Sequence, residues 1–186
     1  MSSYYDKIIE TVSFLQERVG YDPEVAVVLG SGLGTFSDNI EISHKIPYSD
    51  IPHFPPATVK GHEGALIFGE LGGKKIVAQA GRFHYYEGYD MKEVTFPIRV
   101  FKFMNVKALL IASAVGGIHD DYEAGDVTVV NDHINLHHHN PLQGPNDERL
   151  GPRFPDMTDA YSPRLIDLCH KIAEENHIAL HNSVYG

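Results

Sequence analysis

The chain has 186 residues, a length that suits one compact domain with a hydrophobic core. Its formal net charge of −10 argues against generic binding to nucleic acid or to an anionic membrane, because the 15 basic residues are scattered and leave no surplus to neutralise phosphates. No apolar stretch approaches the length of a membrane span, and the N-terminus lacks a signal-peptide pattern, so we expect a cytoplasmic protein.

Helix and strand signals alternate through the first half of the chain. Apolar residues at helical spacing predict an amphipathic helix over 5–19 that ends near Gly20. The run 25–29 (VAVVL) is apolar and β-branched, which predicts a strand buried on both faces. Runs 65–68 and 76–80 flank a glycine-containing turn and therefore predict a β-hairpin.

The second half continues this alternation. The patterns predict a helix, two strands, a further helix and the start of a strand over 91–104, 107–112, 127–130, 163–177 and 183–186. The first of these helices contains Pro97, and the strand that follows it (KALLIA) is expected to be buried. Ser162 and Pro163 are a suitable N-cap and first-turn pair for the later helix. The sequence thus predicts an α/β fold in a single domain over 1–186.

The only cysteine, Cys169, cannot form an internal disulfide bond. It lies among apolar residues of the last predicted helix, without a neighbour that would stabilise a thiolate. We therefore expect a small buried side chain rather than a nucleophile.

A glycine-rich turn, 30–34 (GSGLG), directly follows the first buried strand. Glycines allow backbone N–H groups to converge on an anion, and the Ser31 hydroxyl can add a donor. The spacing matches neither the dinucleotide fingerprint nor a P-loop. Taken alone, the turn is equally compatible with phosphate binding and with a tight connection between a strand and a helix.

Functional groups are also dense after a later strand, over 81–89 (GRFHYYEGY). Arg82 and His84 fall on the same side if the strand continues, so a guanidinium group and an imidazole would both face an oxyanion. The alternative is a polar strand end with aromatic core packing. The preceding loop, 55–64, contains His62, which either reaches an anion or belongs to a solvated connection.

His133 and the run 137–139 raise the question of a metal site. Adjacent histidines rarely all face one ion, and no cysteine or carboxylate spacing completes a site. We expect no metal, and instead a surface or subunit-contact loop.

Taken together, these segments closely resemble the homotrimeric purine nucleoside phosphorylases. The matching segments occur in the family's order and span nearly the whole chain: 30–34 (GSGLG), 60–62 (KGH), 81–89 (GRFHYYEGY), 94–100 (VTFPIRV), 132–136 (DHINL) and 140–147 (NPLQGPND). The resemblance implies a three-layer α/β/α fold around a twisted mixed sheet. It also implies the phosphorolysis of purine (deoxy)ribonucleosides to free base and (deoxy)ribose 1-phosphate, a reaction of purine salvage, with inorganic phosphate as co-substrate and no other cofactor.

The resemblance assigns roles to particular residues. Phosphate would be held by Ser31, Arg82, His84 and the backbone at Ala114, with His62 closing over it. Among the remaining assigned residues, Tyr86 would contact the ribose, Glu87 would hold the phosphate-binding side chains in place, and Phe154 would cover the nucleoside of a neighbouring subunit. The catalytic assignments are His84 and Glu87.

Two departures limit what the resemblance implies. The family's stretch Asn-Ala-Ala/Ser-Gly-Gly is replaced by 113–117 (SAVGG), and the family's purine-recognition residues lie beyond residue 186. We therefore expect a chain that lacks the C-terminal part of the fold and has weak activity at most. The alternatives are a methylthioadenosine phosphorylase, which shares the phosphate chemistry, and a truncated fragment that binds phosphate without catalysis.

Overall fold

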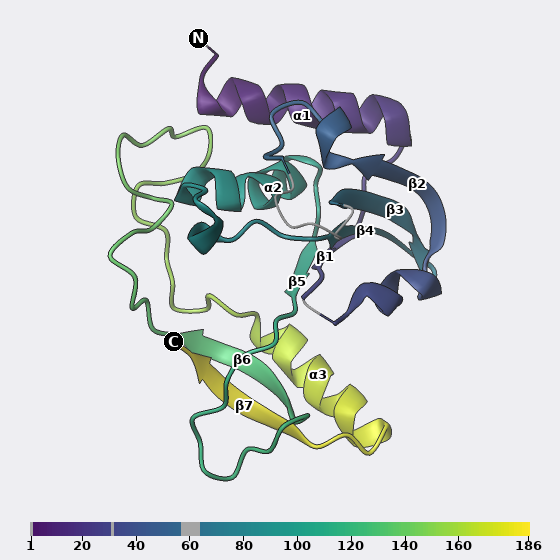
Figure 1. Ribbon diagram of the computed structural model, residues 1–186, viewed down its shortest axis with the longest axis vertical. Helices are drawn as coiled ribbons and strands as arrows, with labels where there is room; N and C mark the ends of the chain where they lie inside the picture. Colours follow the sequence, from purple (N-terminus) through teal and green to yellow (C-terminus); the bar gives the residue numbers. More distant parts are fainter. Residues whose placement is uncertain (1, 31, 57–63) are drawn as a thin grey trace. The chain divides into compact units, whose positions relative to one another are not determined.

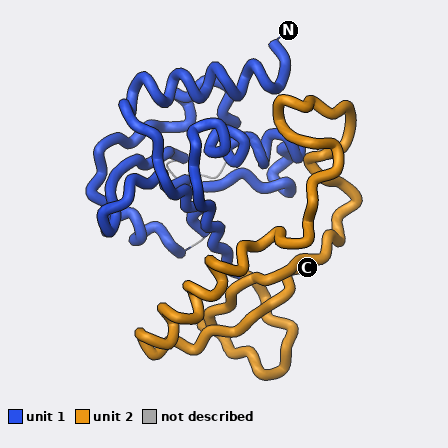
Figure 2. The backbone as a smooth tube through the Cα atoms, turned by 180° about the vertical axis from the view of Figure 1, so that it is seen from behind, with its two compact units in different colours: residues 1–114 blue, residues 115–186 orange. Residues whose placement is uncertain are grey.

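The computed structural model describes residues 2–30, 32–56 and 64–186. It contains two compact units, 1–114 and 115–186, which we call unit 1 and unit 2 (Figure 2). The expected single domain over 1–186 stays a prediction. Among the described residues, no helix combines the length and the apolar character that crossing a bilayer requires.

Unit 1 is built on a five-stranded mixed sheet (Figure 1). Its strands, in chain order, are β1 (Val25–Val28), β2 (Glu41–Pro47), β3 (Ala65–Leu71), β4 (Lys74–Ala80) and β5 (Ala108–Ile111). They lie in the order β2-β3-β4-β1-β5. Strand β1 runs parallel to β4 and β5, whereas β3 is antiparallel to β2 and β4. The predicted α/β class with a mixed sheet is confirmed.

The centre of this sheet is buried on both faces. One cluster of buried residues comprises Val27, Leu29, Ile40, Ile67, Ile76 and Ala78. The residues that alternate with them along the strands, Ala26, Val28, Leu66, Phe68 and Val77, are also buried. Because successive side chains of a strand point to opposite faces, neither face of β1 is exposed to water. The two-sided burial predicted for the run 25–29 is therefore confirmed.

The predicted hairpin is formed by β3 and β4, in which Leu71 pairs with Lys74. Gly72 and Gly73 connect these strands with φ values of 58° and 74°. A two-residue turn with positive φ at both positions matches the right-handed twist of the strands, and glycine adopts it without strain. The turn residues thus fix the register of the hairpin that leads into residues 81–89.

Two helices accompany the sheet of unit 1, α1 (Tyr4–Val19) and α2 (Met91–Phe103). Ser3 and Asp6 form a capping box at the start of α1. The helix ends at Gly20, where the sequence predicted its end, and Gly20 has the left-handed conformation. Asp90 and Glu93 form a second capping box at the start of α2, which continues through Pro97. The two helices pack through aromatic pairs, Tyr4 with Phe96 and Tyr5 with Phe103, whose ring centroids lie 5.8 and 5.6 Å apart.

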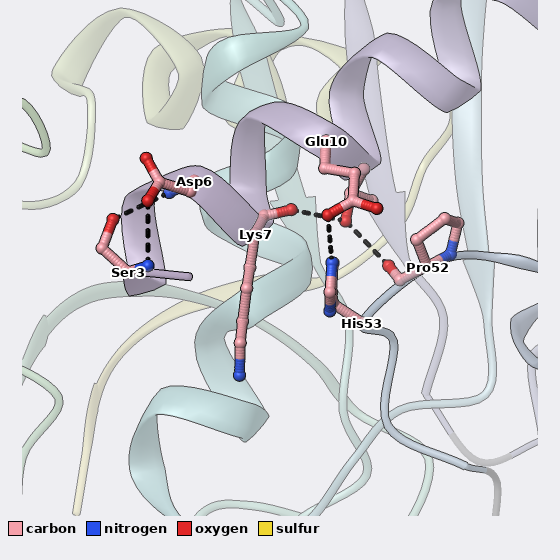
Figure 3. Close-up of polar contacts among 7 residues, drawn as sticks. Ser3, Asp6, Lys7, Glu10, Pro52 and His53 are labelled. Carbon is pink, nitrogen blue, oxygen red and sulfur yellow. Dashed lines mark hydrogen bonds and ion pairs between the residues drawn. The ribbon is translucent and has the colours of Figure 1, made fainter. Parts of the chain in front are cut away.

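Helix α1 is also attached to the segment that follows β2 (Figure 3). The buried Thr11 hydroxyl donates to the carbonyl oxygen of Pro52 at 2.7 Å. Beside it, His53 Nε2 lies 2.6 Å from the Glu10 carboxylate. His53 has a φ of 63°, an unfavourable value for a residue with a side chain. Contacts from two consecutive helix residues therefore hold this turn against α1.

Short 3₁₀ helices and strand β2 are the elements of unit 1 that sequence patterns did not predict. The 3₁₀ helices are η1 (Gly34–Asn39), η2 (Tyr48–Asp50) and η3 (Tyr85–Glu87). Strand β2 is exposed along most of its length and its register with β3 shifts between Ile42 and His44. A polar edge strand with such an irregularity shows no clear period of two, which explains why the pattern is weak.

Unit 2 contains two parallel strands and one helix, β6 (Val127–His133), α3 (Pro163–Glu175) and β7 (Leu180–Tyr185). These elements confirm the predicted strand–helix–strand succession, although α3 ends before residue 177 and β7 begins before residue 183. Ser162 occupies the predicted N-cap position and Pro163 begins the helix, but the Ser162 side chain makes no capping hydrogen bond.

Two predictions of burial are wrong. Within the described part of the chain, strand β5 pairs only with β1 and is the edge strand of the sheet. Its Leu110 and Ile111 are 46% and 62% exposed. An apolar run predicts a strand but does not say whether that strand lies at the centre of the sheet or at its edge. Cys169 is half-buried rather than fully buried, because α3 packs beside only a two-stranded sheet in its unit.

Candidate functional site

The predicted functional residues of unit 1 follow three neighbouring parallel strands. Because β4, β1 and β5 are parallel, their carboxyl ends lie at the same edge of the sheet. The chain continues from β1 into Gly30, from β4 into Arg82 and from β5 into Ala112. Backbone hydrogen bonds keep the three ends in register, from Leu29 N–H to the Gln79 carbonyl and from Ala112 N–H to the Val28 carbonyl, each at 3.1 Å. Crevices at such edges are common ligand sites.

Arg82 is held tightly at this edge. Its Nη2 donates a hydrogen bond of 2.6 Å to the carbonyl oxygen of Ala112. A Cβ atom added to Gly30 would lie 2.6 Å from that oxygen and 2.7 Å from Arg82 Nη2. Gly30 is therefore required by the close approach of the guanidinium group, a reason that the sequence alone did not reveal. The glycine-rich turn provides the space that Arg82 occupies.

His84 is fixed by a carboxylate from the next turn of the chain. Glu87 Oε1 lies 2.5 Å from His84 Nδ1 and accepts a second hydrogen bond, of 3.0 Å, from the His84 backbone N–H. The Glu87 side chain is only 8% exposed. Because an ionised carboxylate only accepts hydrogen bonds, Nδ1 carries the proton and Nε2 is the ring atom that remains for a ligand. That atom becomes a donor when the imidazole is protonated.

Tyr86 lies against this imidazole. Its ring is stacked on that of His84, with centroids 4.7 Å apart and an interplanar angle of 21°. The side chain is otherwise 81% exposed. An exposed aromatic ring beside a histidine offers an apolar surface next to polar donors, which is a combination suited to a sugar. The role of Tyr86 in ribose contact stays a prediction.

These groups have the chemistry that an oxyanion receptor needs. An arginine has five N–H donors in a planar fork, and among the described residues only the Ala112 carbonyl accepts from Arg82. Charge-assisted bonds from a guanidinium group and an imidazole are the strong contacts that a phosphate dianion needs. The arrangement provides those two donor types on one segment, and the binding of one anion by both stays a prediction.

The remaining predicted site residues are less closely defined. Ser31 and His62 lie outside the described residues. Ala114 is exposed in an irregular stretch after β5, two positions beyond the carbonyl that accepts from Arg82. Phe154 belongs to unit 2, is 88% exposed and has no described role there. Its predicted contact with the nucleoside of a neighbouring subunit stays a prediction.

The histidines that raised the question of a metal site are exposed. Among the residues that the structure describes, no group of three or more histidine, cysteine, aspartate or glutamate side chains is arranged to hold a metal ion. His133 instead packs its ring against Tyr161, with centroids 5.7 Å apart.

Sequence patterns missed two contributors to the site, Tyr48 and the Ala112 carbonyl. The Tyr48 phenol contacts the turn that carries Arg82, as described below. Tyr48 lies in a 3₁₀ segment without periodicity, and a backbone carbonyl has no signature in a sequence. The only available signal was the Tyr48 side chain itself, a large aromatic residue between Pro47 and Ser49.

Comparison with known proteins finds relatives of this chain among the phosphorylases. Residues 24–186 match the Phosphorylase superfamily. The chain is 48% identical to purine nucleoside phosphorylase 1 of Geobacillus stearothermophilus over 178 residues, which are 96% of this chain and 65% of that protein. The chain thus spans about two thirds of the length of this relative.

Solved structures show the same likeness. A purine nucleoside phosphorylase crystallised with ribose 1-phosphate is 40% identical and superposes with a TM-score of 0.93, covering 100% of this chain and 70% of that one. The Schistosoma mansoni enzyme in complex with inosine is also 40% identical, with a TM-score of 0.91 and coverage of 96% and 64%. The predicted nucleoside phosphorylase-like α/β fold is confirmed.

Proposed function

Because the chain belongs to the purine nucleoside phosphorylase family of the Phosphorylase superfamily, we propose that it catalyses the phosphorolysis of purine (deoxy)ribonucleosides. The products are the free base and (deoxy)ribose 1-phosphate. The observation that carries the proposal is Arg82, held between Gly30 and the Ala112 carbonyl, on the same segment as the His84–Glu87 pair.

In this proposal phosphate binds to Arg82, His84 and the backbone at Ala114, together with Ser31 and His62. One phosphate oxygen forms a bond to the anomeric carbon while the glycosidic bond breaks, and the bonding electron pair leaves with the base. The sugar passes through an oxocarbenium-like state, which a nearby oxyanion stabilises and is already positioned to attack. No side-chain nucleophile is required, and phosphate is the only co-substrate.

Glu87 supports this chemistry through His84. Its carboxylate accepts from Nδ1 and fixes the orientation of the imidazole, so that Nε2 is the ring atom that hydrogen-bonds the phosphate in this scheme. Tyr86, stacked on the same ring, borders the place where the ribose binds in this scheme.

The proposal also includes the cellular context. We place the protein in the cytoplasm and in purine salvage, and, where the fold is complete, as a homotrimer in which Phe154 covers the nucleoside of the adjacent subunit. The support for the trimer is the resemblance of the chain's six matching segments to the homotrimeric family. Sedimentation equilibrium of the purified chain tests the oligomeric state, and a monomer at micromolar concentration contradicts the trimer.

The experiment that tests the reaction is the release of hypoxanthine from inosine with and without inorganic phosphate. We expect weak release, and only when phosphate is present. Methylthioadenosine in the same panel separates the two phosphorylase specificities. Arg82→Lys keeps the charge but loses the fork, and should reduce phosphate affinity at least about tenfold. The matched control is Arg18→Lys, because Arg18 packs over the Phe14 ring at 4.2 Å, on α1. Absence of both phosphate binding and phosphorolysis in the unaltered chain contradicts the proposal.

A further inference from the structure

The buried Tyr48 makes a hydrogen bond to the turn that carries Arg82. The Tyr48 side chain is 2% exposed, and its phenol donates a hydrogen bond of 2.5 Å to the carbonyl oxygen of Gly81. The same hydroxyl lies 3.2 Å from the Ala80 carbonyl. The Tyr48 backbone N–H donates to the carbonyl of Gly64 at 2.9 Å. One residue thus joins the start of β3 to the end of β4.

The Gly81 peptide needs such an anchor. Gly81 has a φ of 91°, in the region that favours glycine, and directly precedes Arg82. Glycine occupies positive and negative φ about equally well, so the backbone alone does little to prevent this peptide from rotating. A rotation here redirects the chain at Arg82. The hydrogen bond from Tyr48 to the Gly81 carbonyl is the described side-chain contact that opposes it.

Tyr48 itself has little freedom to move. Its ring packs against Phe54 and Phe83, with centroids 5.3 and 5.1 Å away, and Phe83 packs in turn against Tyr89. The turn at Pro52 and His53, a few residues beyond Tyr48, is attached to α1 through Thr11 and Glu10 (Figure 3). The phenol is therefore presented from a rigid support.

The phenol of Tyr48 is protonated at neutral pH because it is buried. Burial raises the pKa of the phenol, and the neighbouring Gln79 side chain offsets part of that rise. Gln79 is itself 2% exposed, and its Oε1 has no hydrogen-bond partner among the described residues. At neutral pH the phenol therefore keeps the proton that it donates to Gly81.

We infer that Tyr48 is a positioning residue for the anion site, acting through the Gly81 peptide on Arg82. The inference rests on the proposed function, because it assigns Tyr48 to the same phosphate site. Tyr48 touches no reacting atom in this scheme. Its hydroxyl fixes the direction in which Arg82 leaves β4, so that the guanidinium group reaches the Ala112 carbonyl and faces the anion.

The test is Tyr48→Phe, which removes the hydroxyl and keeps the ring of the aromatic cluster. Its matched control is Tyr4→Phe, because the Tyr4 phenol likewise donates to a backbone carbonyl, that of Lys92, at 2.8 Å. Inorganic phosphate is titrated calorimetrically into the full chain and into both variants, and urea unfolding is measured for each. We expect Tyr48→Phe to weaken phosphate binding about tenfold, and Tyr4→Phe to leave it unchanged although both variants lose some stability.

A second measurement tests the positioning role of Tyr48 independently of phosphate binding. The ¹⁵N–¹H signals of the Arg82 guanidinium group report its hydrogen bond to the Ala112 carbonyl in the absence of phosphate. We expect the guanidinium protons to exchange faster in Tyr48→Phe and at an unchanged rate in Tyr4→Phe. Unchanged Arg82 signals and exchange in Tyr48→Phe overturn the positioning role, whatever the calorimetry gives. If the unaltered chain does not bind phosphate but Arg82 responds to Tyr48→Phe, the positioning role is upheld and the proposed function is contradicted.

Discussion

The Arg82 guanidinium group and the Ala112 carbonyl are joined by a hydrogen bond of 2.6 Å between residues that lie 30 positions apart in the sequence. The bond connects the ends of β4 and β5 across the end of β1, which lies between them. Gly30, at the end of β1, leaves the space through which the guanidinium group passes. The geometry of the candidate anion site therefore depends on three strand ends at once.

Replacement of Gly30 by alanine should displace Arg82. The added Cβ would approach Ala112 O and Arg82 Nη2 to less than 3 Å, so one of them must move. We expect phosphate affinity to fall at least about tenfold and the free energy of unfolding to fall by about 1–3 kcal/mol, the usual effect of overpacking. Calorimetry with phosphate and urea unfolding measure the two effects.

Gly34→Ala is the matched control for this change. It introduces the same methyl group into the same glycine-rich segment, where nothing lies within 4 Å of the new atom. We expect phosphate binding close to that of the unaltered chain. Equal losses in the two variants would show that the glycine-rich segment matters for its flexibility rather than for the space that it gives Arg82.

The charge of Glu87 should matter more than its capping bond. Glutamine at this position still accepts from the His84 backbone N–H, but loses the charge-assisted bond to Nδ1. We expect Glu87→Gln to weaken phosphate binding about five- to tenfold, measured by calorimetry near neutral pH. The control is Glu93→Gln, because Glu93 accepts from the Asp90 backbone N–H in an equivalent capping box away from His84. An effect of the same size in both variants argues for a purely structural role.

Local sequence patterns were sufficient to predict most helices and strands. They failed where tertiary packing determines whether a strand forms or how deeply it is buried. Turn glycines and apolar spacing located α1 and the β3–β4 hairpin, because caps and turns are local in sequence. Strand β2 was missed because its side chains are mostly exposed and its register is irregular. The burial of β5 was predicted wrongly because its place at the edge of the sheet depends on β1, a partner far away in the chain.

The candidate site was also predicted in part from local sequence and missed where residues distant in sequence meet. The residue types of the 81–89 segment indicated an anion site, since arginine and histidine after a strand are chemically suggestive. The sequence could not indicate that Gly30 serves Arg82, or that Tyr48 reaches the Gly81 carbonyl. Both relationships join residues that are distant in sequence, and neither follows a periodic pattern.

The buried phenol of Tyr48 should make stability fall at high pH. Burial raises its folded-state pKa above the ordinary value of 10.0, whereas the unfolded chain ionises near that value. The contribution of this group is therefore complete below pH 10 and is lost as the pH rises through the folded-state pKa. Between these limits the free energy of unfolding should fall by about 1.4 kcal/mol per pH unit because of Tyr48. Urea unfolding at several pH values between about 9 and 11 gives the free energy of unfolding as a function of pH. This free energy should fall less steeply with pH in Tyr48→Phe than in the unaltered chain. Parallel slopes would show that Tyr48 does not cause the fall.

The attachment of α1 to the Pro52 turn should contribute measurably to stability. Thr11 is fully buried, and its hydroxyl is shared between the carbonyl oxygens of Pro52 and Lys7 at 2.7 and 2.9 Å. Thr11→Val keeps the shape of the side chain but removes the donor, which leaves the Pro52 carbonyl without this hydrogen bond. We expect a loss of about 1–2 kcal/mol in the free energy of unfolding. The control is Thr35→Val, the same substitution at an exposed position, for which a change within about 0.5 kcal/mol is expected. If Thr11→Val unfolds at the same urea concentration as Thr35→Val, the contact shown in Figure 3 adds no stability to the fold.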